Sequence, residues 1–207
     1  MSQVDLGLDA LNPNEVIPTL TEHEGSDALR LVLTPDAETP DNPTFARIKN
    51  LEFHNGTIEI EVAGRPLPDA IPEARGFIGV AFRIQDDLSA FECMYLRPTN
   101  GRAEQQLRRN RATQYFSYPD WKFDRLRTEV PGHYESYVDL VTGAWTRMRI
   151  EVDGDKAKLF VHDQEHPTII VNDLKHGAEF KRQHWSLYRQ WHGRLFPQLK
   201  CYPRLAI

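Results

Sequence analysis

Polar and aromatic side chains gather in the middle third of this 207-residue sequence, and their types could hold a small polar ligand. Aromatic rings can stack on the apolar CH faces of a sugar, while arginine, asparagine and glutamine side chains can bond its hydroxyl groups. Two arginines directed into one cleft would also suit a carboxylate or another anionic group. We therefore predict a site for a saccharide or a similar polar ligand formed by Arg83, Tyr95, Arg97, Asn100, Arg109, Gln114, Tyr115, Tyr118, Trp121 and Arg127, with Tyr134 and Glu135 beside them.

The same residues also fit a structural interpretation. The arginines could pair with Glu92, Glu129 and Glu135 at the rim of the domain, and the rings could cover the edge of the core. Ion-pair networks and binding clefts have similar compositions, so the sequence leaves both interpretations open. The binding interpretation predicts that Arg83, Arg97 and Glu59 converge on one shared hollow.

Two pairs of carboxylates could support acid–base chemistry. Glycoside hydrolysis uses two carboxyl groups about 5–5.5 Å apart for retention, or about 6.5–9.5 Å apart for inversion. Glu59 and Glu61 lie two residues apart on a predicted strand, so they face the same way about 7 Å apart. Glu129 and Glu135 form a second pair, although both pairs could equally be solvent-facing carboxylates. A lyase could instead use Tyr134 as its acid, which makes the catalytic candidates Glu59, Glu61, Tyr134 and Glu135.

Other kinds of site receive little support. Asp153, Asp155, Asn172 and Asp173 could suggest calcium, but they occupy turn positions that Asp and Asn prefer anyway. We predict no metal and no cofactor, and no HExxH motif, catalytic triad or nucleophile elbow is present. The arginines between Arg97 and Arg111 could contact nucleic acid. A net charge of -5 and the absence of a known nucleic-acid module argue against that partner.

The predicted site residues lie on and around β-strands. Three strand-like runs follow one another: TIEIEV at 57–62, FIGVAFRIQ at 77–85 and FECMYLRP at 91–98. Alternation of apolar and polar residues over successive short runs is typical of an antiparallel sheet. A further run at 145–162 predicts a hairpin around Asp153-Gly154, and Pro-rich residues 65–76 predict a connection. Seven to nine strands and no helix predict an all-β sandwich or jelly roll.

Composition sets the class of the chain. Its length suits one all-β domain, which we place at residues 1–180 with a polar leader at 1–27. Hydrophobic content of 40% is typical of a globular protein with a core. Two cysteines cannot form a disulfide framework. No basic and apolar signal segment and no apolar run of about 20 residues is seen, so we predict a cytoplasmic protein with no membrane partner.

The tail at 181–207 differs from the rest of the chain. From Phe180 to Ile207 there is no Asp or Glu, and no strand-like alternation is visible. It could bind a partner, it could pack peripherally, or it could be the product of a frameshift. His184-Trp185 requires the codons CAY TGG, and displacement by one base gives Ile or Thr followed by Gly. One set of codons reads IGLYIDNGTE and continues as GYFRNL, a strand, a turn and a strand that would close a sandwich.

We favour the frameshift hypothesis because local consistency is lost abruptly at this point. Sequencing the gene tests it. If the closing strand is lost, we also expect an unpaired sheet edge and a chain that folds poorly or forms oligomers.

Residues 45–175 resemble bacterial and fungal proteins of the concanavalin A-like lectin/glucanase superfamily, which includes laminin-G-like domains and family-16-like glycosyl hydrolase domains. The segments that carry the resemblance are FHNGTIEIEVAG, GFIGVAFRIQD, FECMYLRPTNG, NRATQYFSYPDW, PGHYES and WTRMRIEVDGDKAKLFVHD. The resemblance implies a jelly roll of two antiparallel sheets, one of them concave and open to ligand.

The resemblance is less informative about activity, because the superfamily includes lectins, hydrolases, lyases and inert modules. Family-16 glucanases carry a strand with three acidic residues, Glu-x-Asp-x-x-Glu or Glu-x-Asp-x-Glu. This chain has only Glu59-Ile60-Glu61, with no third carboxylate in register. We therefore predict a lectin-like carbohydrate-binding domain, with a glycoside hydrolase or polysaccharide lyase as the alternative.

Overall fold

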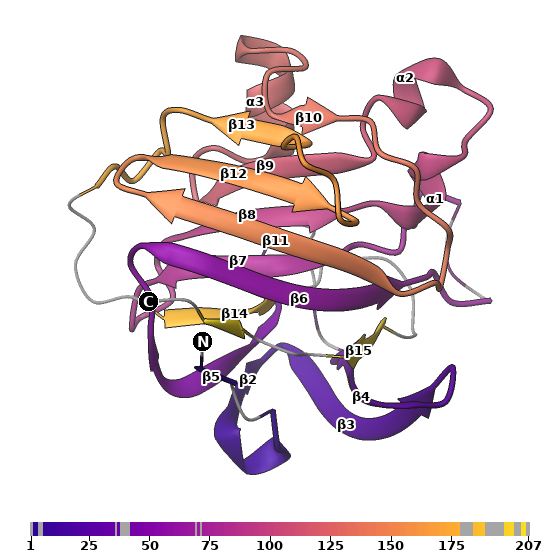
Figure 1. Ribbon diagram of the computed structural model, residues 1–207, viewed down its shortest axis with the longest axis vertical. Coiled ribbons are helices and arrows are strands. Elements are labelled where there is room, and N and C mark those ends of the chain that lie inside the picture. Colours follow the sequence, from indigo (N-terminus) through magenta and orange to yellow (C-terminus); the bar gives the residue numbers. More distant parts are fainter. Residues whose placement is uncertain are drawn as a thin grey trace.

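The computed structural model is a sandwich of two antiparallel sheets, each with seven strands in the described part of the chain (Figure 1). The structure describes residues 2–3, 6–35, 37, 42–68, 70, 72–178, 184–188, 197–200 and 204–205, with side chains only between residues 6 and 178. This architecture confirms the predicted all-β jelly-roll sandwich of two antiparallel sheets.

We call the layer nearer the viewer in Figure 1 the front sheet and the other the back sheet. The front sheet contains, in spatial order, β13 (Ile169–Val171), β12 (Lys156–Val161), β11 (Thr146–Asp153), β6 (Gly56–Gly64), β15 (Pro197–Lys200), β4 (Ser26–Leu33) and β3 (Val16–His23). The back sheet contains β10 (Glu135–Ser136), β9 (Thr113–Tyr118), β8 (Phe91–Leu96), β7 (Ile78–Ile84), β14 (His184–Tyr188), β5 (Phe45–Glu52) and β2 (Leu11–Asn14). A separate ribbon pairs β1 (Ser2–Gln3) with β16 (Arg204–Leu205).

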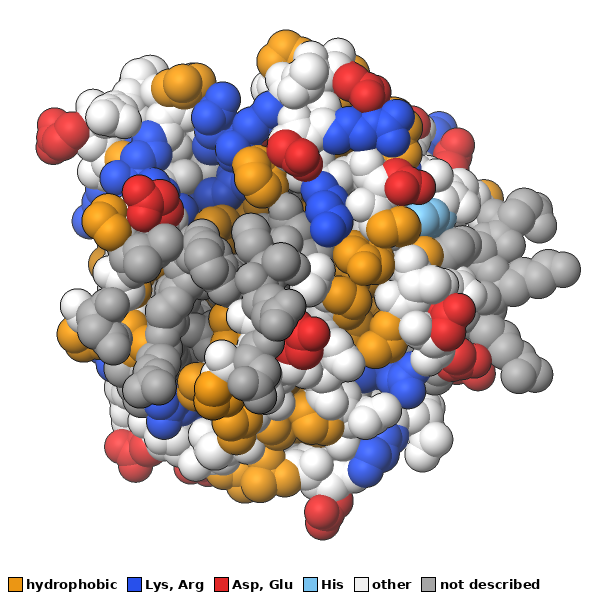
Figure 2. Space-filling model, turned by 180° about the vertical axis from the view of Figure 1, so that it is seen from behind, with side chains coloured by type: hydrophobic (Ala, Val, Ile, Leu, Met, Phe, Trp, Pro, Cys, Tyr) orange, Lys and Arg blue, Asp and Glu red, His pale blue; other side chains and the backbone are white. Residues whose placement is uncertain are grey.

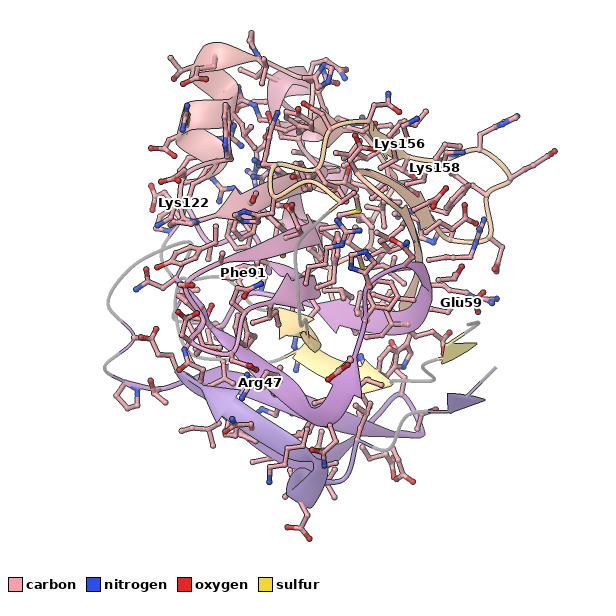
Figure 3. All side chains as sticks on the ribbon, turned by 90° about the vertical axis from the view of Figure 1, so that its left-hand side faces the viewer. Arg47, Glu59, Phe91, Lys122, Lys156 and Lys158 are labelled. Atoms are coloured by element: carbon pink, nitrogen blue, oxygen red, sulfur yellow. The ribbon has the colours of Figure 1, made fainter. Side chains whose placement is uncertain are left out.

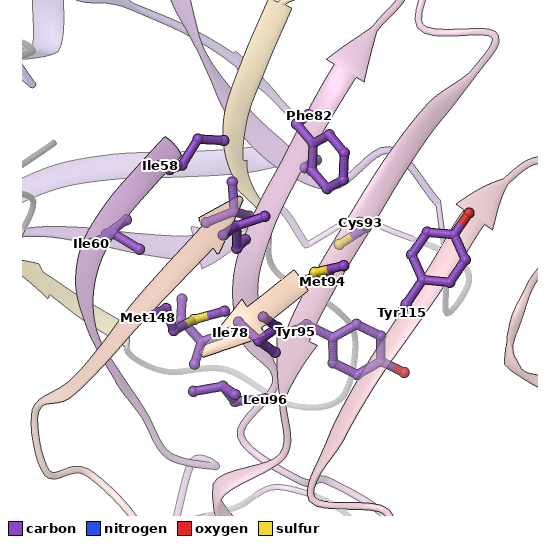
Figure 4. Close-up of a cluster of buried hydrophobic side chains, with 14 of the residues drawn as sticks. Ile58, Ile60, Ile78, Phe82, Cys93, Met94, Tyr95, Leu96, Tyr115 and Met148 are labelled. Carbon is purple, nitrogen blue, oxygen red and sulfur yellow. The ribbon is translucent and has the colours of Figure 1, made fainter. Parts of the chain in front are cut away.

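The core forms where the inner faces of the two sheets meet. On β6, every second residue from Ile58 to Val62 is buried while Glu59 and Glu61 between them are half-buried, as the alternating sequence predicts. Ile60 pairs with Met148 on β11, and Val80 pairs with Met94 on β8. Figure 4 shows side chains of both sheets in one cluster of buried residues. The predicted hairpin at Asp153-Gly154 is also present, because Asp153 pairs with Lys156.

Short helices lie outside the sandwich, although the sequence predicted none. They are η1 (Leu8–Ala10), α1 (Pro98–Gly101), α2 (Gln106–Arg109) and α3 (Phe123–Glu129). Because each spans at most seven residues, none shows the long periodic pattern by which a helix is recognised in a sequence. No helix in the described part of the chain is long and apolar enough to cross a membrane.

Residues 1–27 contribute more than the predicted leader. β3 and β4 form a long hairpin around Glu24 and Gly25, both of which have positive φ. β2 pairs with β5 at one margin of the back sheet. Polar residues are common on these strands because strands at the margin of a sheet are partly exposed to solvent.

The described parts of the tail lie within the sheets. β14 pairs with β7 on one side and β5 on the other, and β15 lies between β6 and β4. Both sheets therefore have a strand position that the chain fills from residues beyond 180. The reading frame of this segment stays a prediction, which sequencing the gene tests.

Candidate functional site

A row of side chains crosses four strands on the outer face of the back sheet. Gly79 on β7 pairs with Tyr95 on β8, Tyr95 pairs with Gln114 on β9, and Gln114 pairs with Glu135 on β10. Residues paired in adjacent antiparallel strands point to the same side, so these residues share one face. Arg97 follows two residues after Tyr95, and its backbone N–H continues the pairing by bonding the carbonyl of Ala112.

Gly79 provides the space that this row needs. A Cβ atom at this position would lie 2.6 Å from Cβ of Tyr95 and 2.3 Å from the carbonyl oxygen of Met94. Both distances are shorter than non-bonded contacts allow, so only glycine fits. Tyr95 consequently lies close against β7, where its ring contacts Phe77 at 5.6 Å between centroids.

The outer face curves and is filled by aromatic rings. Phe91 on β8 and Phe45 on β5 lie 5.4 Å apart between ring centroids, although β7 and β14 separate their strands. Three strand spacings amount to about 14 Å on a flat sheet, so the sheet must curve toward this side. Phe91 also stacks on Tyr118 at 5.0 Å. Phe91 and Tyr95 are fully buried, so their rings offer no open surface for a sugar.

Arg97 connects the residues of the row. Its Nη2 donates to the Tyr95 hydroxyl at 2.5 Å and to Oε1 of Gln114, and its Nη1 donates to the carbonyl of Arg111 and to Oε1 of Glu135, both at 3.1 Å. The guanidinium also lies over the Tyr95 ring, 4.9 Å from its centroid. Arg97 is 4% exposed, so this charge is held almost entirely inside the protein.

Glu135 is surrounded by three arginines. Its Oε1 accepts from Arg97 and, at 2.6 Å and 3.0 Å, from Arg127, while Oε2 lies 3.3 Å from Nε of Arg111. The Glu135 side chain is 6% exposed, whereas Arg111 and Arg127 are 32% and 26% exposed. We call Arg97, Arg111, Arg127, Glu135 and Gln114 the arginine cluster. The structural interpretation predicted that the arginines pair with Glu92, Glu129 and Glu135; in the structure, Arg97 and Arg127 pair with Glu135.

A fully buried donor in the arginine cluster has no acceptor among the described residues. Gln114 is fully buried, and its Oε1 accepts from Arg97 and from the Tyr95 hydroxyl. Its Nε2 has no hydrogen-bond partner within the described residues. A buried N–H group without an acceptor costs free energy, and a ligand oxygen or a water could satisfy it.

The helices beside β8 and β9 support the cluster. Asn100 on α1 donates through Nδ2 to the carbonyl of Arg111 at 2.9 Å, and its Oδ1 accepts from Arg108 at 2.9 Å. Arg109 on α2 donates to the hydroxyl of Tyr137 at 3.1 Å and stacks on its ring. Of the predicted binding residues, the structure brings together Tyr95, Arg97, Asn100, Gln114 and Arg127, with Arg109 nearby.

The rings of Trp121 and Tyr118 are covered by positively charged side chains of the same protein. Arg125 lies 3.7 Å from the Trp121 ring centroid and Lys175 lies 4.6 Å from it. Lys122 lies 5.1 Å from the ring of Tyr118. Both rings are half-buried. A sugar would have to displace these cations before it could stack there.

Arg83 lies outside the cluster, and the prediction that it converges with Arg97 is wrong. Its φ of 54° interrupts the alternation of β7, and β7 and β8 run antiparallel, so Arg83 and Arg97 lie toward opposite ends of the sheet. Arg83 is fully buried and donates to the carbonyl oxygens of His54, Gly154 and Gly177 and to Oδ1 of Asn55. It fastens three chain segments at one end of the sandwich.

Tyr115 lies on the inner face beside Glu92. Its hydroxyl donates to Oε2 of Glu92 at 2.7 Å and accepts from the backbone N–H of Lys175 at 3.0 Å. Burial raises the pKa of Glu92 above its usual value, although hydrogen bonds to its carboxylate oppose this effect. Burial and the nearby Glu92 also raise the pKa of Tyr115. Tyr115 therefore points away from the arginine cluster.

Tyr134 also faces inward, although Glu135 follows it directly. Its ring contacts that of Tyr115 at 5.2 Å, and its hydroxyl donates to the carboxylate of Asp173 at 2.7 Å. Burial raises the pKa of Tyr134, with a further contribution from Asp173, while Lys175 acts in the opposite direction. An acid–base pair of Tyr134 and Glu135 would need both on one face, and the structure places them on opposite faces.

Glu59 and Glu61 lie on the outer face of the front sheet, far from the arginine cluster. Figure 3 shows Glu59 on the side of Lys156 and Lys158, while Phe91 and Arg47 lie on the other side of the molecule. The carboxylate of Glu59 pairs with Arg147 at 2.9 Å. The predicted convergence of Glu59 with Arg83 and Arg97 is therefore also wrong. Alternation shows which residues of a strand share a face, but it does not show which of the two sheets the strand joins.

The remaining candidate carboxylates have separate partners. Glu129 pairs with Arg125 at 2.7 Å, one turn away on α3. Asp173 pairs with Lys175 at 2.6 Å, and the carbonyl of Asp155 accepts from the N–H of Leu174. No group of three or more His, Cys, Asp or Glu residues in the described part of the chain could hold a metal ion.

Sequence reasoning missed Arg111 as a member of the arginine cluster and Phe77 as a ring that contacts Tyr95. Arg111 precedes β9 by two residues and was seen only as part of an arginine run. The alternation of β9 places Gln114 on the outer face. Glu135, which pairs with Gln114 across the strands, therefore lies on the same face and could bind an arginine there. That signal requires the pairing of β9 with β10, which the sequence does not specify.

Comparison with known proteins supports the fold. No protein-family model matches this chain, and no curated protein matches it. Among solved structures, it is similar to the carbohydrate-binding module CBM66 from Bacillus subtilis, with a TM-score of 0.55 and 11% identity, covering 91% of this chain and 94% of that one. A mutant of the Emp46p carbohydrate recognition domain aligns with a TM-score of 0.47 and 13% identity, covering 93% and 88%. At 11% identity, the first alignment shows a shared fold.

Proposed function

We propose that this domain binds a saccharide at the arginine cluster, in the manner of a lectin, and that it belongs to the concanavalin A-like superfamily. The observation that supports the proposal is the buried, unpartnered Nε2 of Gln114 beside three arginines, two of them partly exposed. Sugar hydroxyl oxygens accept from such donors, and sugar hydroxyl hydrogens can donate to a carboxylate such as Glu135.

The likeness to a carbohydrate-binding module is consistent with this proposal. A shared fold does not carry function by itself, so the residues of the cluster must support the proposal. The site differs from the predicted one in position, because binding would occur at the β10 end of the outer face. The buried rings of Phe91 and Tyr95 would form its base and not its contact surface.

A binding screen with one nearly isosteric variant tests the proposal. We expect calorimetry against a panel of neutral and acidic oligosaccharides to identify at least one ligand. Gln114→Glu should weaken its binding about tenfold, because the change removes the free donor while keeping an acceptor for Arg97. Gln106→Glu is the control, since Gln106 lies exposed on α2 and bonds only Asn110. Absence of binding across the panel, or equal binding by Gln114→Glu and the wild type, contradicts the proposal.

The hydrolase or lyase alternative stays a prediction without a specific observation in its favour. Its candidate residues divide between the front sheet and the two faces of the back sheet. Assays for turnover of chromogenic glycosides and for unsaturated uronate products test it directly.

A further inference from the structure

The arginine cluster carries more positive charge than its acid can neutralise. Arg97, Arg111 and Arg127 all pair with Glu135, and the described residues provide no other acid in ion-pair contact with them. Arg108 and Arg109 lie next to the cluster with neutral partners, Asn100 and Thr99 for the first and Tyr137 for the second. Three guanidinium groups therefore share the Glu135 carboxylate, and two more lie beside them without an ion pair of their own among the described residues.

The excess of positive charge does not extend to Arg102. It makes a two-bond contact with Asp139, at 2.7 Å for each pair of atoms, and so has an acid of its own. Arg75 responds to the excess charge. Burial first, and then repulsion from Arg108 and Arg97, hold the pKa of Arg75 below its usual value, while Glu73 acts in the opposite direction. Figure 2 shows Lys and Arg side chains, with Asp and Glu side chains among them, across the upper part of this side of the molecule.

Several donors of the cluster have no acceptor within the described residues. Arg111 uses Nε for Glu135, which leaves both of its Nη atoms without a bond. Arg127 uses Nε and Nη2, which leaves Nη1. Gln114 adds its buried Nε2, on β9 between Tyr95 of β8 and Glu135 of β10. An oxyanion with two or three oxygens is the group that accepts from several N–H donors at once.

We infer that the saccharide bound here is acidic and that its oxyanion, a carboxylate or a sulfate, binds Arg111 and Arg127 beside Gln114. This inference rests on the proposed function and specifies its ligand class. The planar N–H fork of arginine matches either oxyanion, so both sources share one chemistry. Burying the anion would offset charge that Glu135 leaves unneutralised, which makes a neutral sugar the weaker ligand.

Matched ligands test the inference. Calorimetry would compare a neutral oligosaccharide with its uronate and its O-sulfated counterparts of equal length. We expect at least one acidic form to bind about tenfold or more tightly than the neutral form, and its affinity to fall as salt increases. The arm that binds more tightly identifies the oxyanion.

Variants locate the contact. Arg111→Gln and Arg127→Gln should each weaken binding of the acidic form about 10- to 100-fold, and should change binding of the neutral form much less. Arg149→Gln is the matched control, since Arg149 is 30% exposed and lies on the outer face of the front sheet with Glu151 and Phe160. Thermal unfolding of each variant confirms that it is folded.

The outcomes separate this inference from the proposed function. If neutral and acidic sugars bind equally, or if both arginine variants bind the acidic form like the wild type, the inference fails while saccharide binding stands. If an acidic peptide or an oligonucleotide of similar charge binds more tightly than any sugar, the inference also fails. If nothing on the panel binds, the proposed function fails as well.

Discussion

At the scale of single residues, the structure separates arginines that hold the fold from arginines that are available to a ligand. Arg83 and Arg97 look equivalent in the sequence, since each ends a predicted strand on the same face. Arg83 uses its guanidinium on three backbone carbonyls and one side-chain oxygen, and is fully buried. The sequence could not show this, because no local pattern signals the positive φ of Arg83 and the carbonyls that it bonds lie far away in the chain.

We expect Arg83→Gln to be strongly destabilising and to leave the ligand site intact. Each buried carbonyl that loses its donor costs about 1–3 kcal/mol, so the free energy of unfolding should fall by at least about 3 kcal/mol. Urea denaturation of Arg83→Gln and of the control Arg149→Gln measures the difference. Saccharide affinity of the folded fraction should equal that of the wild type. If Arg83→Gln keeps the stability of the wild type but loses saccharide binding, Arg83 belongs to the binding site after all.

At the scale of elements, alternation predicted the strands and their faces where each strand is long and half-buried. The faces of β6 and β11 follow the sequence pattern, as does the hairpin between β11 and β12. The hairpin of β3 and β4 was missed because Pro18 and the polar residues of β3 weaken its pattern. The candidate site was predicted in part, since Tyr95 and Arg97 do share a face. The pairing of β7 with β8 was predicted, whereas the placement of β6 in the other sheet and the pairing of β9 with β10 could not be, because strand order is a long-range property.

A buried polar cluster holds the segment after β13 against the back sheet. Glu92 accepts from the backbone N–H of His176 at 3.0 Å and from Tyr115, while Arg83 bonds the carbonyl of Gly177 at 2.8 Å. The segment also contributes the N–H of Lys175 to the Tyr115 hydroxyl. These bonds hold the segment that follows β13 of the front sheet against β8 and β9 of the back sheet. β9 also carries Gln114 of the arginine cluster on its opposite face.

The raised pKa of Glu92 makes stability depend on pH in a defined direction. Because burial raises this pKa above the unfolded value of 4.5, the folded chain binds more protons between the two values. The free energy of unfolding should therefore fall as pH rises from 4.5 through the folded pKa. Glu92→Gln should flatten this slope, which urea titrations at several pH values would measure. Equal slopes in the variant and the wild type would show that Glu92 does not titrate in this window.

At the scale of the whole molecule, closure of both sheets depends on residues beyond 180. β14 fills the position between β7 and β5, and every residue of β7 is buried. A strand beside a fully buried neighbour is expected to be apolar on both faces. The present sequence supplies His184 and Ser186 at this position. One set of codons allowed in the displaced reading frame would supply IGLYI instead. The fold thus requires a strand where the frameshift hypothesis provides one.

We expect a chain carrying the displaced frame from residue 184 onward to be more stable than the present chain. Because β14 lies between β7 and β5, we expect apolar residues in place of His184 and Ser186 to contribute on the order of 1–3 kcal/mol. For a domain of this size, each 1 kcal/mol raises the melting temperature by about 2–4 °C. Thermal unfolding and size-exclusion chromatography of the two chains measure the effect, and the present chain should form more oligomers if its sheet is poorly closed. Identical melting temperatures and elution volumes would reject the frameshift hypothesis, because residues in a strand at the middle of a sheet affect the stability of that sheet.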